Sequence, residues 1–524
     1  MAALATVAAR IKVPYPILLV LGGLALGFVP GLPQIELEPD VVFLIFLPPL
    51  LYVSAIFTSW RDFRANLRPI SLLAIGLVLM TTCVVAPVAH WAVGLPWAAA
   101  FVLGAIVSPT DAIAATAVAQ RLGVPRRIVT VLEGESLVND ATGIVAYRIA
   151  VNVGTVAAAF SIWQAGLQFI VGAAGGIAVG LAVGWAVIWA RRLVSDDPSV
   201  QNTISLLTPF AAYLLAKEPS HYAWEYVLGF PGEFAFSGVL AVVACGLYLG
   251  RRTPEVITPE TRIQGYAFWE LVTFLLNGLI FALIGLQLRG IVDALAEDDY
   301  TVPELTLYAG LVSLTVIAVR FLWVFPATYL PRWASRTLRS RDPSPPARAV
   351  TVISWTGMRG VISLAVALAL PLSFPDRDLI LFLTYGVILA TLVVQGLSLP
   401  ALIRTLKLED DGSAEREETQ GRIEIAGAAL ARIEELAEEE WVREDTAERI
   451  RGLYNYRRSR FTVRYGDDED GIEERSAAYQ RLMRELLRAQ REVLIRMRNE
   501  GEIGDEAMHR IERDLDLEEA RLEV

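Results

Sequence analysis

Long apolar stretches alternate with short polar segments along the first 404 residues of the chain. Most stretches are about 18 residues or longer, the length that a helix needs to cross the hydrocarbon core of a membrane. We predict one membrane-spanning helix in each of twelve such stretches. Their approximate bounds are 13–30, 36–57, 69–93, 96–120, 128–154, 160–190, 201–216, 232–250, 266–288, 304–330, 349–371 and 378–403.

The composition and the charge pattern agree with a membrane protein. Of the 524 residues, 54% are hydrophobic, and the mean hydropathy is +0.47. The predicted loops on one side of the spans carry 18 Lys and Arg residues, against three on the other side. Because Lys and Arg near span ends are retained in the cytoplasm, both termini are predicted to be cytoplasmic. The predicted fold class is an all-α polytopic membrane protein.

The chain divides into three parts by composition. Residues 1–12 hold a short apolar segment that is too short to span alone, and we interpret it either as the stub of a span whose beginning is missing or as a frayed, dispensable end. Residues 13–404 form the transmembrane domain. Residues 405–524 carry 33 Asp and Glu against 21 Lys and Arg, whereas residues 1–404 carry 24 against 25. This acidic tail has helical patterns and is predicted to be a cytosolic module for dimer contact or regulation, or else a solvated tail with transient helix. Its acidity argues against nucleic acid or anionic lipid as partners of the tail.

Two neighbouring spans carry polar residues at membrane depth. In Ser108-Pro109-Thr110-Asp111, the proline lacks an N–H, so the helix 96–120 is predicted to break there. A broken helix exposes backbone carbonyls to ions near the midplane of many secondary transporters. In the next span, Ser136 and Asp140 share one helix face, and Glu135 and Asn139 form the adjacent stripe. Ionisable groups at this depth usually belong to an ion or proton pathway.

A third polar site lies in span 11, where Gly357 and Gly360 flank Arg359. The glycines permit an irregular backbone, and the buried arginine needs an anion, for which Glu135 is the natural candidate. Spans 4 and 11 hold corresponding places in two three-span units of opposite orientation. We therefore predict two inverted repeats with crossing broken helices in spans 4 and 11. The two cysteines lie in separate spans and no nucleotide motif is present, so we expect no cofactor.

These motifs together resemble the bacterial sodium/proton exchangers of the monovalent cation:proton antiporter-1 family. The resemblance extends over most of residues 10–404, and the end of the tail also fits bacterial members. The motifs that carry it are Phe46-Leu47-Pro48-Pro49-Leu50-Leu51, Ser108-Pro109-Thr110-Asp111, the run from Glu133 to Asp140, and Gly357-Met358-Arg359-Gly360.

The resemblance implies an antiporter rather than an enzyme, in the inner membrane of a bacterium, with a homodimer as its assembly. It implies exchange of Na⁺ or Li⁺ for H⁺ by alternating access, electroneutral because Asn139 precedes Asp140 where other branches have two acids. It also implies the following roles: Asp140, Ser136 and the carbonyl of Thr110 bind the cation, Asp140 also takes the proton, Asn139 holds the break, Asp111 neutralises helix N-termini, and Arg359 pairs with Glu135.

One departure from the family pattern bears on ion selectivity. Related proteins often have an acidic residue where Val53 stands in this chain, and valine offers no oxygen. The partners that we expect are membrane lipid, a second copy of the chain, and a regulator of the tail. Two other functions stay open: a potassium-selective exchanger or cation channel using the same carboxylates, and an intramembrane hydrolase using Ser136.

Overall fold

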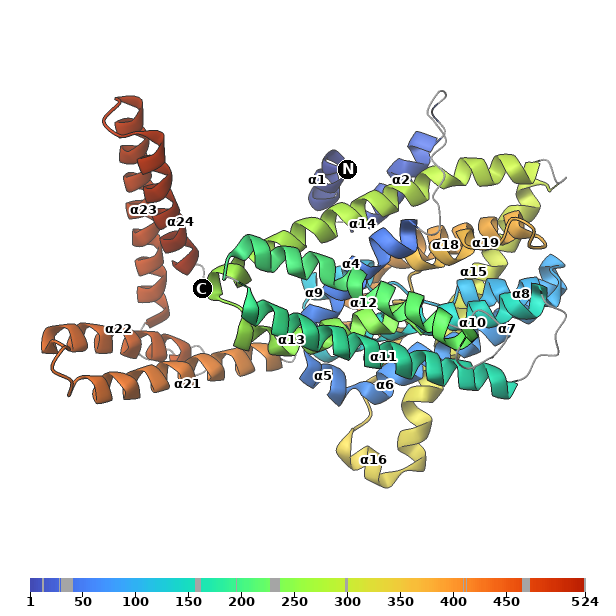
Figure 1. The fold of residues 1–524 in the computed structure, drawn as a ribbon, viewed down its shortest axis with the longest axis horizontal. Coiled ribbons are helices and arrows are strands. Elements are labelled where there is room, and N and C mark those ends of the chain that lie inside the picture. The colour runs from blue at the N-terminus through green and yellow to red at the C-terminus, as the bar shows by residue number, and fades with distance from the viewer. Residues whose placement is uncertain are drawn as a thin grey trace. The chain divides into compact units, whose positions relative to one another are not determined.

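The computed structural model describes the chain apart from residues 12–13, 28, 30–40, 156–161, 195, 227–235, 297–299, 409, 411, 464–471 and 523–524. The chain forms two compact units, Met1–Asp410 and Asp411–Val524. Both units are built from helices, and no strand occurs in the part of the chain that the structure describes (Figure 1).

The first unit contains helices of very different lengths, several of them interrupted by π-helical turns. The α-helices are α1 (Ala2–Ile11), α2 (Tyr15–Gly27), α4 (Leu47–Phe57), α5 (Trp60–Ala65), α6 (Leu67–Ser71), α7 (Val78–Val88), α8 (Trp97–Ile106), α9 (Ile113–Arg121), α10 (Arg126–Thr155), α11 (Ile162–Leu193), α12 (Pro198–Tyr226), α13 (Gly238–Val256), α14 (Pro259–Ala296), α15 (Val302–Ala334), α16 (Arg336–Arg341), α17 (Ala347–Trp355), α18 (Val361–Leu368), α19 (Arg377–Ala390) and α20 (Gly396–Leu406). The π-helical segments are η1 (Val42–Phe46), η2 (Leu72–Leu77), η3 (Ala89–Val93) and η4 (Thr391–Gln395).

Five helical segments of the described chain are long and apolar enough to cross a membrane: Leu67–Val93, Phe169–Leu193, Pro259–Ile291, Val302–Ala334 and Arg377–Leu406. Each coincides with a predicted span. The other predicted spans correspond to helices that are shorter, broken or more polar, such as α10 with its carboxylates. The number of twelve spans therefore stays a prediction, as do the inverted repeats.

Both predicted helix breaks are present. Helix α8 ends at Ile106 and α9 begins at Ile113, with Pro109 in the non-helical segment between them. Helix α17 ends at Trp355 and α18 begins at Val361, after a second non-helical segment. Proline and glycine therefore interrupt these two helices where their backbone chemistry predicted.

Glycines let the helices of this unit approach one another closely. A Cβ atom on Gly23 of α2 would lie 2.2 Å from the Ala282 carbonyl oxygen of α14, and one on Gly285 would lie 2.3 Å from that of Val20. Such close backbone packing is typical of small residues at helix interfaces in membranes. Helices α11, α12 and α13 also lie side by side (Figure 1).

An ionic cluster ties the loop after α16 to the helices beside it. Asp342 accepts hydrogen bonds from Arg127 of α10 and Arg332 of α15, both at 2.6 Å, and Arg68 of α6 lies 3.5 Å away. These arginines belong to the loops that the charge count assigns to the cytoplasm. One carboxylate thereby links three separate helices.

The second unit consists of two helix pairs. Helix α21 (Ser413–Leu436) packs against α22 (Glu444–Val463), and an ion pair of 2.7 Å joins Arg451 to Glu434. Helix α23 (Ile472–Asn499) packs against α24 (Asp505–Leu522) around a small apolar core of Leu487, Leu494, Met508 and Leu515. This core shows why the amphipathic pattern of the tail is helical, because each helix buries its apolar stripe against the other.

Candidate functional site

The break between α8 and α9 gives the site its backbone groups. Because Pro109 cannot continue the helix, Ser108 turns its hydroxyl back to the Ala105 carbonyl, at 2.9 Å. The Asp111 side chain accepts a hydrogen bond of 2.8 Å from the Ile113 N–H and so satisfies the first turn of α9. The Thr110 carbonyl is left pointing toward α10.

Helix α10 supplies the side chains that face this break. Asn139 donates hydrogen bonds from its amide nitrogen to the Thr110 carbonyl oxygen, at 3.2 Å, and to the Thr110 hydroxyl, at 2.8 Å. That hydroxyl donates in turn to Glu135, at 2.9 Å, and the Ser136 hydroxyl accepts a weaker bond of 3.4 Å from the Ala112 N–H. The carboxamide of Asn139 therefore holds the break, as the resemblance implied.

The second break contacts the first directly. The backbone N–H of Asp111 donates a bond of 2.8 Å to the Met358 carbonyl oxygen. A Cβ atom on Gly360, immediately before α18, would lie 2.0 Å from an Asp111 carboxylate oxygen. Only a residue without a side chain therefore lets this carboxylate approach the start of α18. Asp111 thus lies at the N-terminal ends of both α9 and α18, which favour a negative charge.

Arg359 occupies the opposite ends of the broken helices. Its Nε donates a bond of 3.0 Å to the Val107 carbonyl, just beyond α8, and another guanidinium nitrogen donates to the Gly357 carbonyl, just beyond α17. The side chain is fully buried. Carbonyl groups at helix C-termini carry partial negative charge, so they stabilise the arginine without a carboxylate.

The predicted ion pair between Glu135 and Arg359 is wrong. Glu135 pairs with Arg320 of α15, whose two terminal nitrogens contact the two carboxylate oxygens, one of them at 2.7 Å. The side chains are 2% and 0% exposed, respectively, and the Arg320 Nε also donates to the Ile353 carbonyl, at 3.0 Å. The sequence contained the signal, because Arg320 also lies in the middle of a predicted span. Nothing in the local sequence, however, shows that Glu135 pairs with Arg320, 185 residues away, and not with Arg359.

Asp140 differs from the other two carboxylates of the site. It is 3% exposed, yet no hydrogen bond or ion pair engages its carboxylate among the residues that the structure describes. It lines a cavity of about 60 Å³ together with Ser136, Thr110 and Asp111. Ser54 of α4 and Ser363 of α18 also line this cavity, and sequence reasoning missed both of them. The Ser54 hydroxyl adds an oxygen beside the position where Val53 has none.

The comparison with known proteins identifies the family. The sodium/hydrogen exchanger transmembrane family matches residues 1–405. The chain belongs to this family. It is therefore a transporter of the sodium/proton antiporter class and not an enzyme, as predicted.

Individual relatives agree over most of the chain. An uncharacterised Na⁺/H⁺ exchanger of Mycobacterium tuberculosis (strain ATCC 25618 / H37Rv) is 37% identical over 521 residues, which cover 98% of this chain and 92% of that protein. A sodium, potassium, lithium and rubidium/H⁺ antiporter of Bacillus pumilus (strain SAFR-032) is 36% identical over 406 residues, 74% of this chain and 58% of that protein. The sodium proton antiporter MjNhaP1 from Methanocaldococcus jannaschii shares the fold, with a TM-score of 0.60 and 21% identity over 77% of this chain and 95% of that chain.

Proposed function

We propose that the protein exchanges a monovalent cation, Na⁺ or Li⁺, for H⁺ across the plasma membrane of a bacterium, with Asp140 as the group that binds both ions. The observation that supports this most directly is the buried, unpaired carboxylate of Asp140 in a small cavity lined by hydroxyl groups. A carboxylate at membrane depth is costly unless it is paired, protonated or bound to a cation. Because Asp140 is unpaired in this site, its carboxylate must be either protonated or bound to a cation.

The formal charges at the two breaks support a single exchangeable ion. Asp111, Glu135 and Asp140 contribute three negative charges, whereas Arg320 and Arg359 contribute two positive charges. The site therefore carries a net charge of −1 when Asp140 is ionised and empty. One proton or one monovalent cation brings this sum to zero, so either loaded form crosses the membrane at a similar electrical cost. This equality supports electroneutral exchange.

The remaining groups of the cavity suit a hard cation. The hydroxyl of Ser136 and the second lone pair of the Thr110 carbonyl are oxygen ligands of the kind that alkali cations prefer. Asn139 uses one acceptor position of that carbonyl and fixes its direction. The cavity of about 60 Å³ has room for water, since about 10–15 Å³ of such space is enough for one molecule. We expect water to complete the cation shell.

Alternating access then requires the cavity to open to one side of the membrane at a time. Proton and cation compete for Asp140, so uncoupled movement would require the site to cross the membrane empty. The uncompensated charge of the empty carboxylate makes this crossing costly, and the cost prevents uncoupled movement. We further propose a homodimer with both termini in the cytoplasm. The name of the Bacillus pumilus relative keeps potassium as a second candidate cation for this chain.

Exchange in proteoliposomes tests the proposal. Asp140→Asn is expected to abolish cation-driven proton movement while the protein stays folded, because the amide binds neither a titrating proton nor a cation strongly. The matched control is Glu133→Gln on the same helix, since Glu133 bonds Gln120 outside the cavity. Exchange retained by purified, monodisperse Asp140→Asn would overturn the mechanism and point to Asp111 as the carrier. Comparing sodium, lithium and potassium in the same assay decides the cation, and counter-ion-independent flux would indicate a channel instead.

A further inference from the structure

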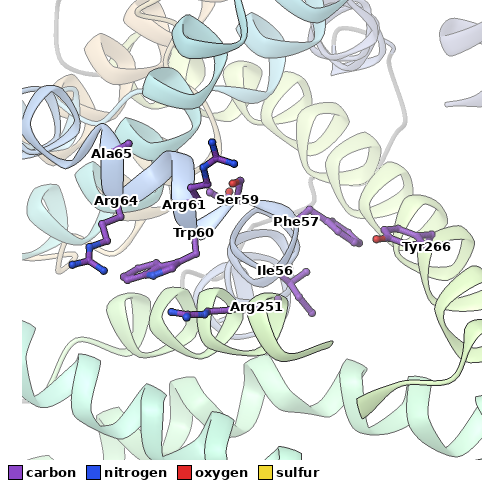
Figure 2. Close-up of a pocket in the computed structure, with 11 residues that line it drawn as sticks. Ile56, Phe57, Ser59, Trp60, Arg61, Arg64, Ala65, Arg251 and Tyr266 are labelled. Carbon is purple, nitrogen blue, oxygen red and sulfur yellow. The ribbon is translucent and has the colours of Figure 1, made fainter. Parts of the chain in front are cut away.

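A large cavity apart from the ion site is lined by arginines. It has a volume of about 840 Å³ and lies between the end of α4, helix α5, the end of α13, and α14 (Figure 2). Arg61 and Arg64 reach it from α5, and Arg251 reaches it from α13. Among the described residues that line it, none is Asp or Glu. Arg64 and Arg251 bring two guanidinium groups to a lining without a carboxylate, which makes this cavity attractive to an anion.

The opposite wall of the same cavity is apolar. Phe57 and Tyr266 stack there with ring centroids 5.2 Å apart, next to Ile56 (Figure 2). The two rings are 49% and 56% exposed, respectively, although they are large hydrophobic side chains. A small inorganic anion would leave this aromatic wall uncovered. An amphipathic anion would cover it.

A second, smaller cavity adjoins the first and also contains unneutralised arginine. It has a volume of about 160 Å³ and shares Ile56, Phe57 and Tyr266 with the larger one. Arg191 lines it and is only 5% exposed, yet its Nε has no hydrogen-bond partner and no carboxylate pairs with it among the described residues. The Nε of Arg262 in the same wall is also unpaired. Arg262 is only partly buried and bonds the Ile257 carbonyl through another nitrogen, whereas the buried guanidinium of Arg191 needs an anion or ordered water nearby.

The position of these cavities along the predicted spans favours a lipid. The larger cavity lies where three predicted spans end, at Phe57, Gly250 and Tyr266. These span ends lie at headgroup depth, where aromatic side chains gather at the membrane interface. All five arginines belong to loops that the charge count assigns to the cytoplasm, whose leaflet carries the anionic lipids.

We propose that these adjoining cavities form a binding site for an anionic phospholipid. Its phosphate lies between Arg64 and Arg251, and its acyl chains lie along Phe57 and Tyr266. Arg191 adds positive charge from the smaller cavity. The site is separate from the cavity at Asp140, and the inference does not depend on which ion the protein exchanges.

Lipid binding to the purified full chain in detergent tests this proposal. The probes are dioleoylphosphatidylglycerol, dioleoylphosphatidylcholine and inorganic phosphate, with bound lipid counted by native mass spectrometry and stability followed by thermal unfolding. We expect phosphatidylglycerol to be retained and to raise the melting temperature, while phosphatidylcholine and phosphate do neither. The variant Arg64→Gln with Arg251→Gln should weaken phosphatidylglycerol binding at least tenfold. The matched control, Arg336→Gln with Arg339→Gln, removes two exposed arginines of the same predicted side outside both cavities and should bind normally.

Three results would overturn the proposal. Equal stabilisation by inorganic phosphate would assign the arginines to a soluble anion, and equal retention of phosphatidylcholine would remove the role of charge. Unchanged binding by the cavity variant would place the lipid elsewhere. If that variant does not fold, quenching of Trp60 by phosphatidylglycerol brominated at the headgroup end of its chains gives an independent answer, because Trp60 lines the cavity. Because the chain has 12 tryptophans, the contribution of Trp60 is the difference in quenching between the protein and its Trp60→Phe variant. That difference should be clear with brominated phosphatidylglycerol and smaller with brominated phosphatidylcholine, and an equal difference for both lipids would refute the site.

Discussion

Breaking the ion pair between Glu135 and Arg320 should destabilise the protein strongly and in a coupled way. The variant Glu135→Gln keeps the size of the side chain but removes the charge that holds Arg320, a side chain that is completely buried. The guanidinium would then keep its bond to the Ile353 carbonyl and at most one neutral acceptor from the glutamine, with no negative charge to balance its own. Removing one member of a buried pair costs about 3–5 kcal/mol, because the other charge is left uncompensated.

The reciprocal change, Arg320→Met, should cost about the same. It leaves the Glu135 carboxylate with a single hydrogen bond from Thr110. The double variant has neither charge, so we expect its cost to be about 2–3 kcal/mol less than the sum of the two single costs. Glu135→Gln combined with Arg359→Met provides the comparison. Its coupling should stay below about 1 kcal/mol, since Arg359 donates to backbone carbonyls and not to Glu135.

Unfolding free energies measured by tryptophan fluorescence during titration with sodium dodecyl sulfate in mixed micelles check both cycles. All variants are compared in the same detergent and salt, and refolding on dilution establishes reversibility. Additive costs for Glu135→Gln and Arg320→Met would show that the two side chains are not coupled. A larger coupling with Arg359 than with Arg320 would contradict the pairing that the structure shows.

Three further changes test other parts of the argument. If one proton and one cation compete at Asp140, the apparent sodium affinity should fall about tenfold per pH unit on the acidic limb of the exchange profile, and that limb should move to lower pH as sodium rises; a limb that stays fixed would place the proton at a separate sensor. Gly360→Ala should push the Asp111 carboxylate away and cost about 1–3 kcal/mol together with most of the exchange activity, whereas Gly310→Ala, which meets nothing within 4 Å, should be nearly neutral in the same assays. Partial burial raises the pKa of Asp342, but hydrogen bonds and attraction from its arginine partners outweigh burial and hold this pKa below the ordinary value of 3.8. The contribution of Asp342 to stability is therefore present above that pH and is lost as the pH falls further. Asp342→Asn should therefore lower the free energy of unfolding by about 1 kcal/mol at neutral pH, a difference that shrinks below about pH 4; a constant difference across this range would refute the ionic role.

The parts of the site that the sequence predicted are those governed by local chemistry. Pro109 cannot donate an N–H, and Gly357 and Gly360 have no Cβ, so both breaks follow from the residues themselves. The spacing of Ser136 and Asp140 on one helix also follows from helix geometry, whatever surrounds that helix. Such features need no knowledge of the neighbouring segments.

The pairing of Glu135 could not be predicted in this way. Two arginines, Arg320 and Arg359, lie at membrane depth in the sequence, and only the tertiary structure shows that Arg320 of α15 is the one that reaches Glu135 of α10. The predicted pair of Glu135 with Arg359 assumed that a buried arginine requires a carboxylate. The carbonyls freed by the two breaks meet that requirement for Arg359 instead. Ser54 and Ser363 were missed for a related reason, because a hydroxyl in a span is usually bonded to its own helix and only the tertiary structure shows which ones line a cavity.

The charged groups at the two breaks are arranged in a regular way, and this arrangement supports the proposal that Asp140 is the group that changes its charge. Arg359 joins the carbonyls that follow the C-terminal ends of α8 and α17, and Asp111 lies at the N-terminal ends of α9 and α18. Each of these charges is opposite in sign to the helix ends that it contacts, so both are stabilised in their ionised forms. The ion pair with Arg320 likewise stabilises the ionised form of Glu135. Neutralising any of these groups would weaken contacts that hold the crossing together, whereas protonating Asp140 breaks none. We therefore expect the variable charge at Asp140, the carboxylate of the cavity that has no hydrogen bond or ion pair among the described residues.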